Sequence, residues 1–170
     1  CIRDRAGAKL YYPDDTIQHA GVVVGLGGVA AHVLCKLPRD AEGYMGRLRC
    51  VQEISAVTAA CMMVKTSVFK AVGGFDEELK VAFNDIDLCM KVRKYGVKIV
   101  FTPYAELYHY ESKSRGMEDT PEKQLRFSRE VNCFRRKWER ELLKGDPYYN
   151  PNLTLNNTDC SLRKQEKNGD

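Results

Sequence analysis

Two aspartates, Asp85 and Asp87, stand near the start of residues 81–96, a segment that is otherwise apolar and basic. Carboxylates at the beginning of a helix accept hydrogen bonds from its free N–H groups and lie favourably in the helix dipole. Taken alone, this structural interpretation is the stronger one. The chemical alternative is a carboxylate at the edge of a cavity that takes a proton from a substrate hydroxyl. Because side chains two residues apart point to different sides of a helix, we expect one aspartate to be catalytic and the other structural.

A second group of polar residues lies at positions 106–116, where His109 precedes Lys113 and Arg115, and Gly116 closes the loop. A histidine can bind a metal ion, and lysine and arginine can neutralise phosphate oxygens. The alternative for a lone histidine is a satisfied polar residue at the end of a strand. That alternative is the stronger interpretation of His109 in isolation, because neither group of residues is specific by itself.

Short apolar stretches bounded by turn residues predict the strands that must position these groups. Between them we expect a helix over about residues 85–95, largely buried and ended by Gly96. A shorter helix should begin at Thr66 or Ser67, whose hydroxyl would cap it, and end at Gly73. Residues 30–49 predict a mobile loop or a short helical piece. The expected strands cover residues 8–13, 21–28, 56–65, 97–103 and 105–110.

A long helix is expected over residues 121–144, with Thr120 as its cap, Pro121 at its first position and Gly145 at its end. Its apolar residues recur every three or four positions, which favours core packing over a cofactor site. Basic and acidic residues are mixed along the same helix, so a solvated face is favoured over a stripe that binds nucleic acid. The apolar stripe consists of Phe127, Val131, Phe134, Trp138 and Leu142.

The composition limits the class of protein. The 170 residues are 44% hydrophobic and 29% charged, which suits one soluble globular domain or a large piece of one. A net charge of +4 permits anionic partners without indicating one. No apolar run is long enough to span a bilayer, and no signal-peptide pattern opens the chain. The seven cysteines form no C-x-x-C pair, which is typical of reduced, mostly buried thiols in a cytosolic protein.

Strands and helices mix along the chain, with a strand–helix–strand unit over residues 56–102, and this favours an α/β layered architecture. We expect one domain over residues 1–158 and a polar, disordered tail over residues 159–170. Because the chain opens on Cys1 and enters patterned sequence at once, we also expect it to be part of a longer protein.

Several motifs, taken in order, resemble the C-terminal half of family 2 glycosyltransferases, and most closely the bacterial enzymes that build surface polysaccharides. They are "AVTAACMMVKTSVFKAVGGFDEEL", "NDIDLCMKVRKYGVKIVFTPYAELYHYES" and "SRG", with "GAKLYYPDDTIQHAGVVVGLGG" upstream and "GDPYYNPNLTL" downstream. The ordered set covers nearly the whole chain and is far more specific than any single motif. The resemblance implies an α/β fold of the GT-A (nucleotide-diphospho-sugar transferase) type with a mixed sheet. It also implies a partial domain that lacks the N-terminal nucleotide-binding half.

The resemblance also implies roles for particular residues. The family usually has Glu-Asp ahead of the helix, with the aspartate as general base; here the pair is Asn84-Asp85, so Asp85 inherits that role and Asn84 is a departure. Asp87 would support the helix on the substrate side. His109 matches a histidine that helps to hold a divalent metal, Mg²⁺ or Mn²⁺, or the diphosphate. The last two residues of the predicted site, Lys113 and Arg115, lie where a loop could close over the diphosphate.

The implied reaction is direct displacement at an anomeric carbon, which inverts that centre. The donor would be a nucleotide sugar and the acceptor a saccharide or a lipid-linked saccharide, in the cytoplasm or at the inner face of the membrane, with no nucleic acid involved. A base would act on the acceptor hydroxyl, and a metal ion with cationic side chains would stabilise the leaving diphosphate. Surface contact with the membrane would fit a lipid-linked acceptor.

Two features of the family are missing from this sequence, namely the nucleotide-binding half and the Asp-x-Asp motif that holds the metal. The string "DID" at positions 85–87 matches that motif only as letters, because it opens a helix in the later, acceptor-side context. We therefore expect the chain alone to be inactive and its unpaired strand edges to favour self-association. The alternatives are a homologue without turnover that recognises carbohydrate or assists assembly and, more remotely, a basic nucleic-acid-binding domain.

Overall fold

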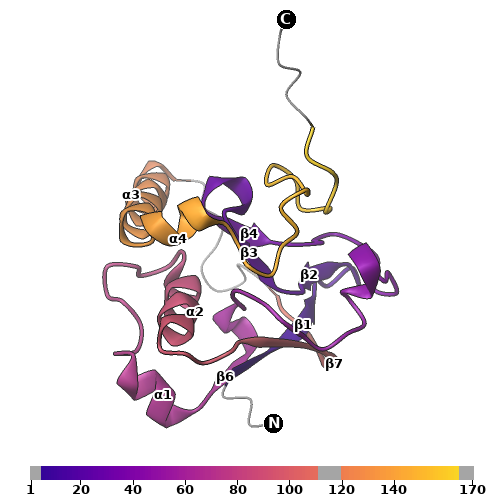
Figure 1. The fold of residues 1–170 in the computed structure, drawn as a ribbon, viewed down its shortest axis with the longest axis horizontal. Coiled ribbons are helices and arrows are strands. Elements are labelled where there is room, and N and C mark those ends of the chain that lie inside the picture. The colour runs from indigo at the N-terminus through magenta and orange to yellow at the C-terminus, as the bar shows by residue number, and fades with distance from the viewer. Residues whose placement is uncertain (1–4, 111–119, 165–170) are drawn as a thin grey trace, which may run out of the picture.

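The computed structural model describes residues 5–110 and 120–164, which form a mixed α/β structure (Figure 1). Its helices gather on one side of the main sheet, and a two-stranded sheet lies between them and the C-terminal segment. Among the described residues, no helix is both long and apolar enough to cross a membrane. The strands are β1 (Arg5–Tyr11), β2 (Ile17–His19), β3 (Val22–Val24), β4 (Ala30–His32), β5 (Gln52–Glu53), β6 (Met62–Val64) and β7 (Val100–Tyr108). The α-helices are α1 (Thr66–Ala71), α2 (Asn84–Lys94), α3 (Pro121–Lys137) and α4 (Glu139–Lys144), and the 3₁₀ turns are η1 (Leu26–Gly28), η2 (Tyr44–Gly46) and η3 (Ala59–Cys61).

The main sheet is built around β1, and its strand order is β2-β1-β7-β5. One edge of β1 pairs with β7 in parallel, and the other edge pairs antiparallel with β6 at its beginning and with β2 at its end. Gly7 in β1 allows a close approach, because a Cβ there would lie 2.5 Å from the side chain of Val57. The sheet is therefore mixed, in agreement with the mixed architecture predicted from the sequence.

Strand β7 is one continuous element, although the sequence predicted two strands, 97–103 and 105–110. Its pairing with β1 shifts register after Thr102, so that Ala8 faces Thr102 and Lys9 faces Glu106. The shift begins at Pro103, which has no N–H to give to a ladder. The proline thus makes an irregularity inside the strand, and the sequence pattern was wrong in treating it as an end.

The prediction of a buried strand over residues 56–65 was also wrong in extent. Only Met62–Val64 pair as β6, and Met63 is 77% exposed. The residues before them form η3, whose cap Thr58 accepts a hydrogen bond from the N–H of Ala60. Since β6 runs antiparallel to β1 and β7 runs parallel to it, β6 and β7 are not the parallel pair of a βαβ unit.

The predicted helix at residues 85–95 is confirmed as α2, and Gly96 follows it in the left-handed conformation at φ 92°. Helix α1 ends before Gly73, which is also left-handed, as predicted. Its predicted cap was wrong, because Lys65 occupies that position and Thr66 already lies inside the helix. A small cluster made of Val68, Leu88 and Val92 joins α1 to α2.

The predicted long helix is two helices, α3 and α4, with a break at Trp138 (φ −114°, ψ 21°). Its start is as predicted, because the Thr120 hydroxyl accepts from the Lys123 N–H and Pro121 takes the first position. Trp138 is 3% exposed and Phe134 is fully buried, which confirms core packing for this part of the stripe. Phe127, near the start of α3, stays 43% exposed, and its ring lies 5.8 Å from that of Phe83, centroid to centroid.

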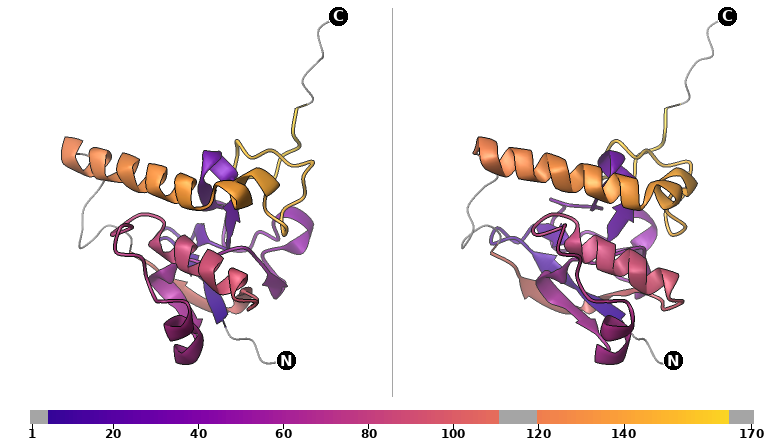
Figure 2. Two further views of the ribbon diagram at one scale, coloured as in Figure 1. Left: turned by 60° about the vertical axis from the view of Figure 1, so that its left-hand side comes forward. Right: turned by 90° about the vertical axis from the view of Figure 1, so that its left-hand side faces the viewer.

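The layers follow from these contacts. Figure 2 shows α3 and α4 lying along α2, with the strands on the other side of α2. Ile86, Cys89 and Met90 of α2 belong to the same core as Phe101 of β7, so α2 is the middle layer. Of the cysteines expected to be buried, Cys89 is fully buried and Cys61 is half-buried.

The C-terminal segment packs back on itself. Leu153 bridges Leu162, the N–H of Thr154 donates to the carbonyl of Ser161, and Cys160 is buried. The boundary expected at residue 158 therefore falls inside a packed segment, while residues 165–170 lie outside the described residues.

Candidate functional site

Asp85 lies in the first turn of α2, half-buried, and its carboxylate is oriented by two backbone N–H groups. One oxygen accepts from the N–H of Ile86 at 2.8 Å, and the other accepts from the N–H of Ala59 in the η3 turn at 3.0 Å. The side chain of Asn84 accepts from the N–H of Asp85 itself at 2.7 Å. A carboxylate has about four lone-pair directions, so these bonds leave acceptor positions for a hydroxyl.

The residue that leads into α2 has an unusual backbone. Phe83 is in the left-handed region at φ 63°, which is costly for a bulky side chain and needs support from its surroundings. That support comes from α3, because the ring of Phe83 lies 5.3 Å from that of Phe134 and 5.8 Å from that of Phe127, centroid to centroid. The turn that presents Asp85 is therefore fixed by packing against α3.

A buried carboxylate on α3 holds the same turn from its other side. Glu130 is 3% exposed, and its two oxygens accept from the N–H groups of Val81 at 3.2 Å and Ala82 at 2.7 Å. Arg126 lies 3.9 Å from the Glu130 carboxylate, one helical turn away. Because hydrogen bonds to an ionised acceptor are strong, Glu130 acts as a clamp on the chain just ahead of Asp85.

Asp87 is fully buried, in contrast to Asp85. It accepts from the Trp138 indole Nε1 at 2.8 Å, and its carboxylate lies 2.8 Å from the Lys137 ammonium and 3.4 Å from that of Lys91. These groups come from α2 itself and from the junction of α3 and α4. These contacts make Asp87 an anchor between helices, and its full burial does not fit the place on the substrate side that the resemblance implied.

His109 follows the last residue of β7 and is tied to β1 and β2. Its N–H donates to the carbonyl of Tyr11 at 2.9 Å, its Nδ1 lies 2.8 Å from the side-chain oxygen of Gln18, and its carbonyl accepts from the Gln18 amide at 3.4 Å. With the Gln18 oxygen as acceptor, Nδ1 carries the proton. Nε2 is then the nitrogen of His109 that could bind a ligand or a metal ion.

The Asp85 and His109 regions are joined through His19 and the η3 turn. The N–H of Thr58 donates to His19 Nε2 at 3.4 Å, and the next N–H, that of Ala59, donates to Asp85. His19 directly follows Gln18, which holds His109, and the rings of His19 and His32 lie edge to face with their centroids 4.8 Å apart. Asp85 and His109 are thus linked only indirectly, through the η3 turn and the neighbouring residues Gln18 and His19, and no direct contact between them is found among the described residues.

Burial keeps His19 neutral. The side chain is fully buried, and this lowers its pKa well below the usual value, with smaller contributions from the nearby His32 and His109. Since Nε2 accepts from Thr58, the proton is on Nδ1, which has no hydrogen-bond partner among the described residues. His19 thus gives the η3 turn a neutral, buried hydrogen-bond acceptor.

The described residues do not form a metal centre. Within residues 5–110 and 120–164, no group of three or more histidine, cysteine, aspartate or glutamate side chains is placed to hold an ion. His109 offers a single nitrogen, whereas Mg²⁺ and Mn²⁺ prefer several oxygen ligands. The chain as described therefore does not fit a divalent ion on its own. The two loop residues of the predicted site, Lys113 and Arg115, lie outside the described residues.

Sequence reasoning missed Glu130, Gln18 and His19 as parts of this region. A signal for Glu130 was available, since it stands three residues after Phe127 and four before Phe134, on the same helix face as the apolar stripe. A carboxylate in such a stripe needs buried partners. For Gln18 and His19 the only signal was two polar residues inside the apolar stretch between Ile17 and Ala20.

Comparison with known proteins places the chain near glycosyltransferase-type sequences. It is 59% identical over 157 residues, 92% of its length, to the uncharacterized protein y4gI of Sinorhizobium fredii. It is 39% identical over 165 residues, 96% of its length, to the O-antigen biosynthesis protein RfbC of Myxococcus xanthus. A shorter match, 36% identity over 62 residues or 36% of the chain, is to the N-acetylglucosaminyl-diphospho-decaprenol L-rhamnosyltransferase of Mycobacterium tuberculosis.

These relatives are much longer than the chain. It spans 17% of y4gI, 12% of RfbC and 20% of the rhamnosyltransferase. No family model matches the chain, and no solved structure matches it. The printed names of the last two relatives describe polysaccharide biosynthesis and glycosyl transfer, so the similarity is to proteins of that class.

Proposed function

We propose that the chain is the acceptor-side part of an inverting family 2 glycosyltransferase of the GT-A fold, acting in polysaccharide biosynthesis. The observation that carries the proposal is the position of Asp85, half-buried in the first turn of α2 with both oxygens oriented by backbone N–H groups. The similarity to RfbC over 96% of the chain supports the same class. The donor would be a nucleotide sugar and the acceptor a saccharide or lipid-linked saccharide.

In this proposal Asp85 is the general base. A carboxylate fixed in this way accepts the proton of the acceptor hydroxyl as that oxygen attacks the anomeric carbon, and the bond to the nucleoside diphosphate breaks. Attack from the face opposite the leaving group inverts the centre. The clamp formed by Glu130 and the packing of Phe83 hold the base in place, because much of the rate depends on the positions of the reacting atoms.

We retain a divalent ion in the proposal, but most of its ligands would have to come from outside the described residues. His109 Nε2 could give one ligand, and oxygen ligands would have to come from the rest of the protein. Lys113 and Arg115 keep their proposed role at the diphosphate. The chain alone should then bind nucleoside diphosphate weakly, show no turnover, and present unpaired strand edges to a second copy or to the rest of the enzyme. The proposed place of action is the cytoplasm or the inner surface of the membrane.

The test uses the full-length protein that contains this chain. Incubation with a panel of uridine and deoxythymidine diphosphate sugars, Mn²⁺ and saccharide acceptors should give a product whose anomeric configuration, read by NMR coupling constants, is opposite to that of the donor. Retention of configuration would contradict the mechanism. Binding of several saccharides without any transfer would instead favour a carbohydrate-recognition domain that has lost turnover.

A second measurement tests the assignment of the donor site. Calorimetric titration of residues 1–170 alone with uridine and deoxythymidine diphosphates, with and without Mn²⁺, should detect only weak binding. Tight, metal-dependent binding by this chain would mean that the donor site lies within it and that the proposed division of the enzyme is wrong.

A further inference from the structure

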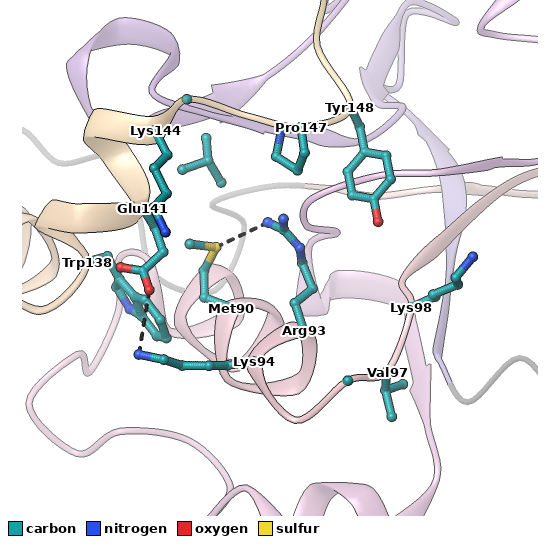
Figure 3. Close-up of a pocket in the computed structure, with 13 residues that line it drawn as sticks. Met90, Arg93, Lys94, Val97, Lys98, Trp138, Glu141, Lys144, Pro147 and Tyr148 are labelled. Carbon is teal, nitrogen blue, oxygen red and sulfur yellow. Dashed lines mark hydrogen bonds and ion pairs between the residues drawn. The ribbon is translucent and has the colours of Figure 1, made fainter.

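A pocket of about 480 Å³ lies at the C-terminal end of α2, the end opposite to Asp85 (Figure 3). It is formed by the last turn of α2, the residues just after it, α4 and the turn that follows α4. Its size is in the range of pockets that hold small organic ligands. Since α2 has 11 residues and a helix rises about 1.5 Å per residue, this pocket lies roughly 15 Å along the helix from Asp85.

The polar centre of the pocket is the guanidinium of Arg93. It is half-buried, donates through Nη1 to the buried hydroxyl of Ser55 at 3.0 Å, and lies over the ring of Tyr148 at 5.4 Å. Figure 3 shows it directed into the space between Met90, Pro147 and Tyr148. In the part of the chain that the structure describes, no carboxylate pairs with Arg93, and its hydrogen bonds, to Ser55 and at 3.6 Å to the sulfur of Met90, are both made by Nη1. An arginine held by a neutral hydroxyl and a ring therefore keeps donors for an anion.

The rest of the lining adds positive charge. Besides Arg93 it contains three lysines, Lys94, Lys98 and Lys144, against the single carboxylate of Glu141. Lys94 lies 3.5 Å from Glu141, and Lys98 is paired at 2.6 Å with Glu53, whose side chain does not line the pocket. For Lys144 no ion pair is found among the described residues. The pocket thus has a cationic surplus close to a partly apolar wall.

The wall and the carboxylate restrict the type of anion. Met90, Pro147 and Tyr148 give the pocket an apolar side that inorganic phosphate would leave uncovered. Glu141 is an acceptor that a ligand with hydroxyl groups can satisfy, whereas a purely apolar anion cannot. A ligand with one anionic group, several hydroxyls and a ring-sized body meets all three conditions.

We propose that this pocket is a binding site for a phosphorylated sugar, with the phosphate at Arg93 and Lys144 and the sugar ring against Tyr148 and Pro147. The site is separate from the Asp85 region and does not depend on the proposed transferase activity. A sugar phosphate bound here would connect α4 to the end of α2, the helix that carries Asp85 at its other end.

Calorimetry or saturation-transfer NMR on the full 170-residue chain tests this proposal, with glucose 1-phosphate as the probe. We expect saturable binding that weakens about tenfold or more in Arg93→Gln, because a hydrogen bond to a charged group contributes at least that factor. Lys144→Gln should weaken binding about two- to threefold, as expected for an exposed charge. The matched control is Lys70→Gln, which removes an exposed lysine from the last turn of another six-residue helix and should change nothing.

Further arms make the outcome decisive. Glucose and inorganic phosphate should each bind much more weakly than glucose 1-phosphate, and Asp85→Asn should bind the probe as the unmodified chain does. Equal binding of inorganic phosphate would overturn the role of the ring, and binding only to phosphatidylglycerol vesicles would replace the sugar by a lipid headgroup. Two results would contradict the proposal. One is undiminished binding by an Arg93→Gln chain that a thermal melt shows to be folded, and the other is the absence of saturable binding to the unmodified chain. Loss of probe binding in Asp85→Asn would contradict the proposal that this site is separate from the Asp85 region.

Discussion

Asp85 and Asp87 are two residues apart on α2, yet the structure gives them opposite surroundings. Asp85 is half-buried, and its two oxygens meet only backbone N–H groups in the contacts described. Asp87 is fully buried and meets the Trp138 indole and the ammonium groups of Lys137 and Lys91. The first carboxylate can still accept a hydrogen bond from an incoming group, while the second is committed to holding helices together.

The comparison shows how one helix can carry a carboxylate that stays available to an incoming group together with the contacts that hold this carboxylate in place. Asp87 joins α2 to the α3–α4 junction, and Glu130 and Phe134 of α3 hold the turn before Asp85. Those contacts surround Asp85 without touching its carboxylate. Changes at Asp85 should therefore alter chemistry, and changes at its supports should alter stability first.

The largest expected effect is at Asp85. If the full-length protein is the proposed transferase, Asp85→Asn in it should lower transfer by ~10²–10⁴-fold, because an amide cannot take the proton of the acceptor hydroxyl. Donor binding, measured by calorimetry, should stay close to normal. Near-normal turnover with the true acceptor would remove the basis for the base role.

Asp87→Asn is the matched control for this change, since it makes the same substitution two residues away. It leaves Lys137 and Lys91 without their buried partner, so we expect the free energy of unfolding to fall by roughly 3–5 kcal/mol. Chemical denaturation measures this loss. If Asp87→Asn left stability intact but abolished transfer, the division of roles between the two aspartates would be wrong.

The next effect concerns the other side of the Asp87 contact. Trp138→Ala removes a side chain that is 3% exposed together with the indole donor to Asp87, and should lower the free energy of unfolding by about 3–5 kcal/mol. Trp138→Phe keeps most of the packing and loses only the hydrogen bond, so its cost should be clearly smaller. Equal costs for the two variants in urea denaturation would show that the hydrogen bond, and not the packing, carries the effect.

A smaller effect is expected at Glu130. Glu130→Gln keeps the shape of the side chain but puts an NH₂ group against one of the two N–H donors, so we expect a loss of about 1–3 kcal/mol in stability. If the clamp positions Asp85, transfer should also fall while the KM for the donor stays unchanged. Activity that falls only in proportion to the folded fraction would limit Glu130 to a structural role.

Local patterns in the sequence were sufficient to predict several helix ends and the burial of some side chains. The start of α3 at Thr120-Pro121 and the end of α2 at Gly96 follow from backbone chemistry that acts within a few residues, and both were predicted. The different surroundings of the two aspartates could be predicted because helix geometry fixes the directions of neighbouring side chains. Burial of Trp138 followed from the period of the apolar stripe.

The remaining features depend on contacts between distant segments. Strand β7 continues past Pro103 because β1 pairs with it on both sides of the proline. The last helix breaks at Trp138, whose indole N–H donates to Asp87, 51 residues away. The indirect link from Asp85 to His109 passes through the η3 turn and the Gln18–His19 pair, two segments with no common pattern in sequence. Polar residues in apolar stretches, such as Glu130, indicate that a partner exists without identifying it.

The smallest expected effect is at the start of α3, and it tests whether this helix supports Asp85 as a whole or through particular contacts. Thr120→Ala removes the hydroxyl that accepts from the Lys123 N–H and should cost about 1 kcal/mol of stability, the usual value for a helix cap. The first turn would fray, but Glu130, Lys137 and Trp138 lie two or more turns further along and would keep their contacts with the Asp85 and Asp87 turns. Transfer activity, compared at a temperature where both proteins are folded, should then be unchanged. Thr120→Ser, which keeps a capping hydroxyl, serves as the control and should recover most of the stability. A loss of transfer in Thr120→Ala that exceeds its loss of folded protein would mean that the integrity of the whole helix, and not its individual contacts, holds Asp85 in position.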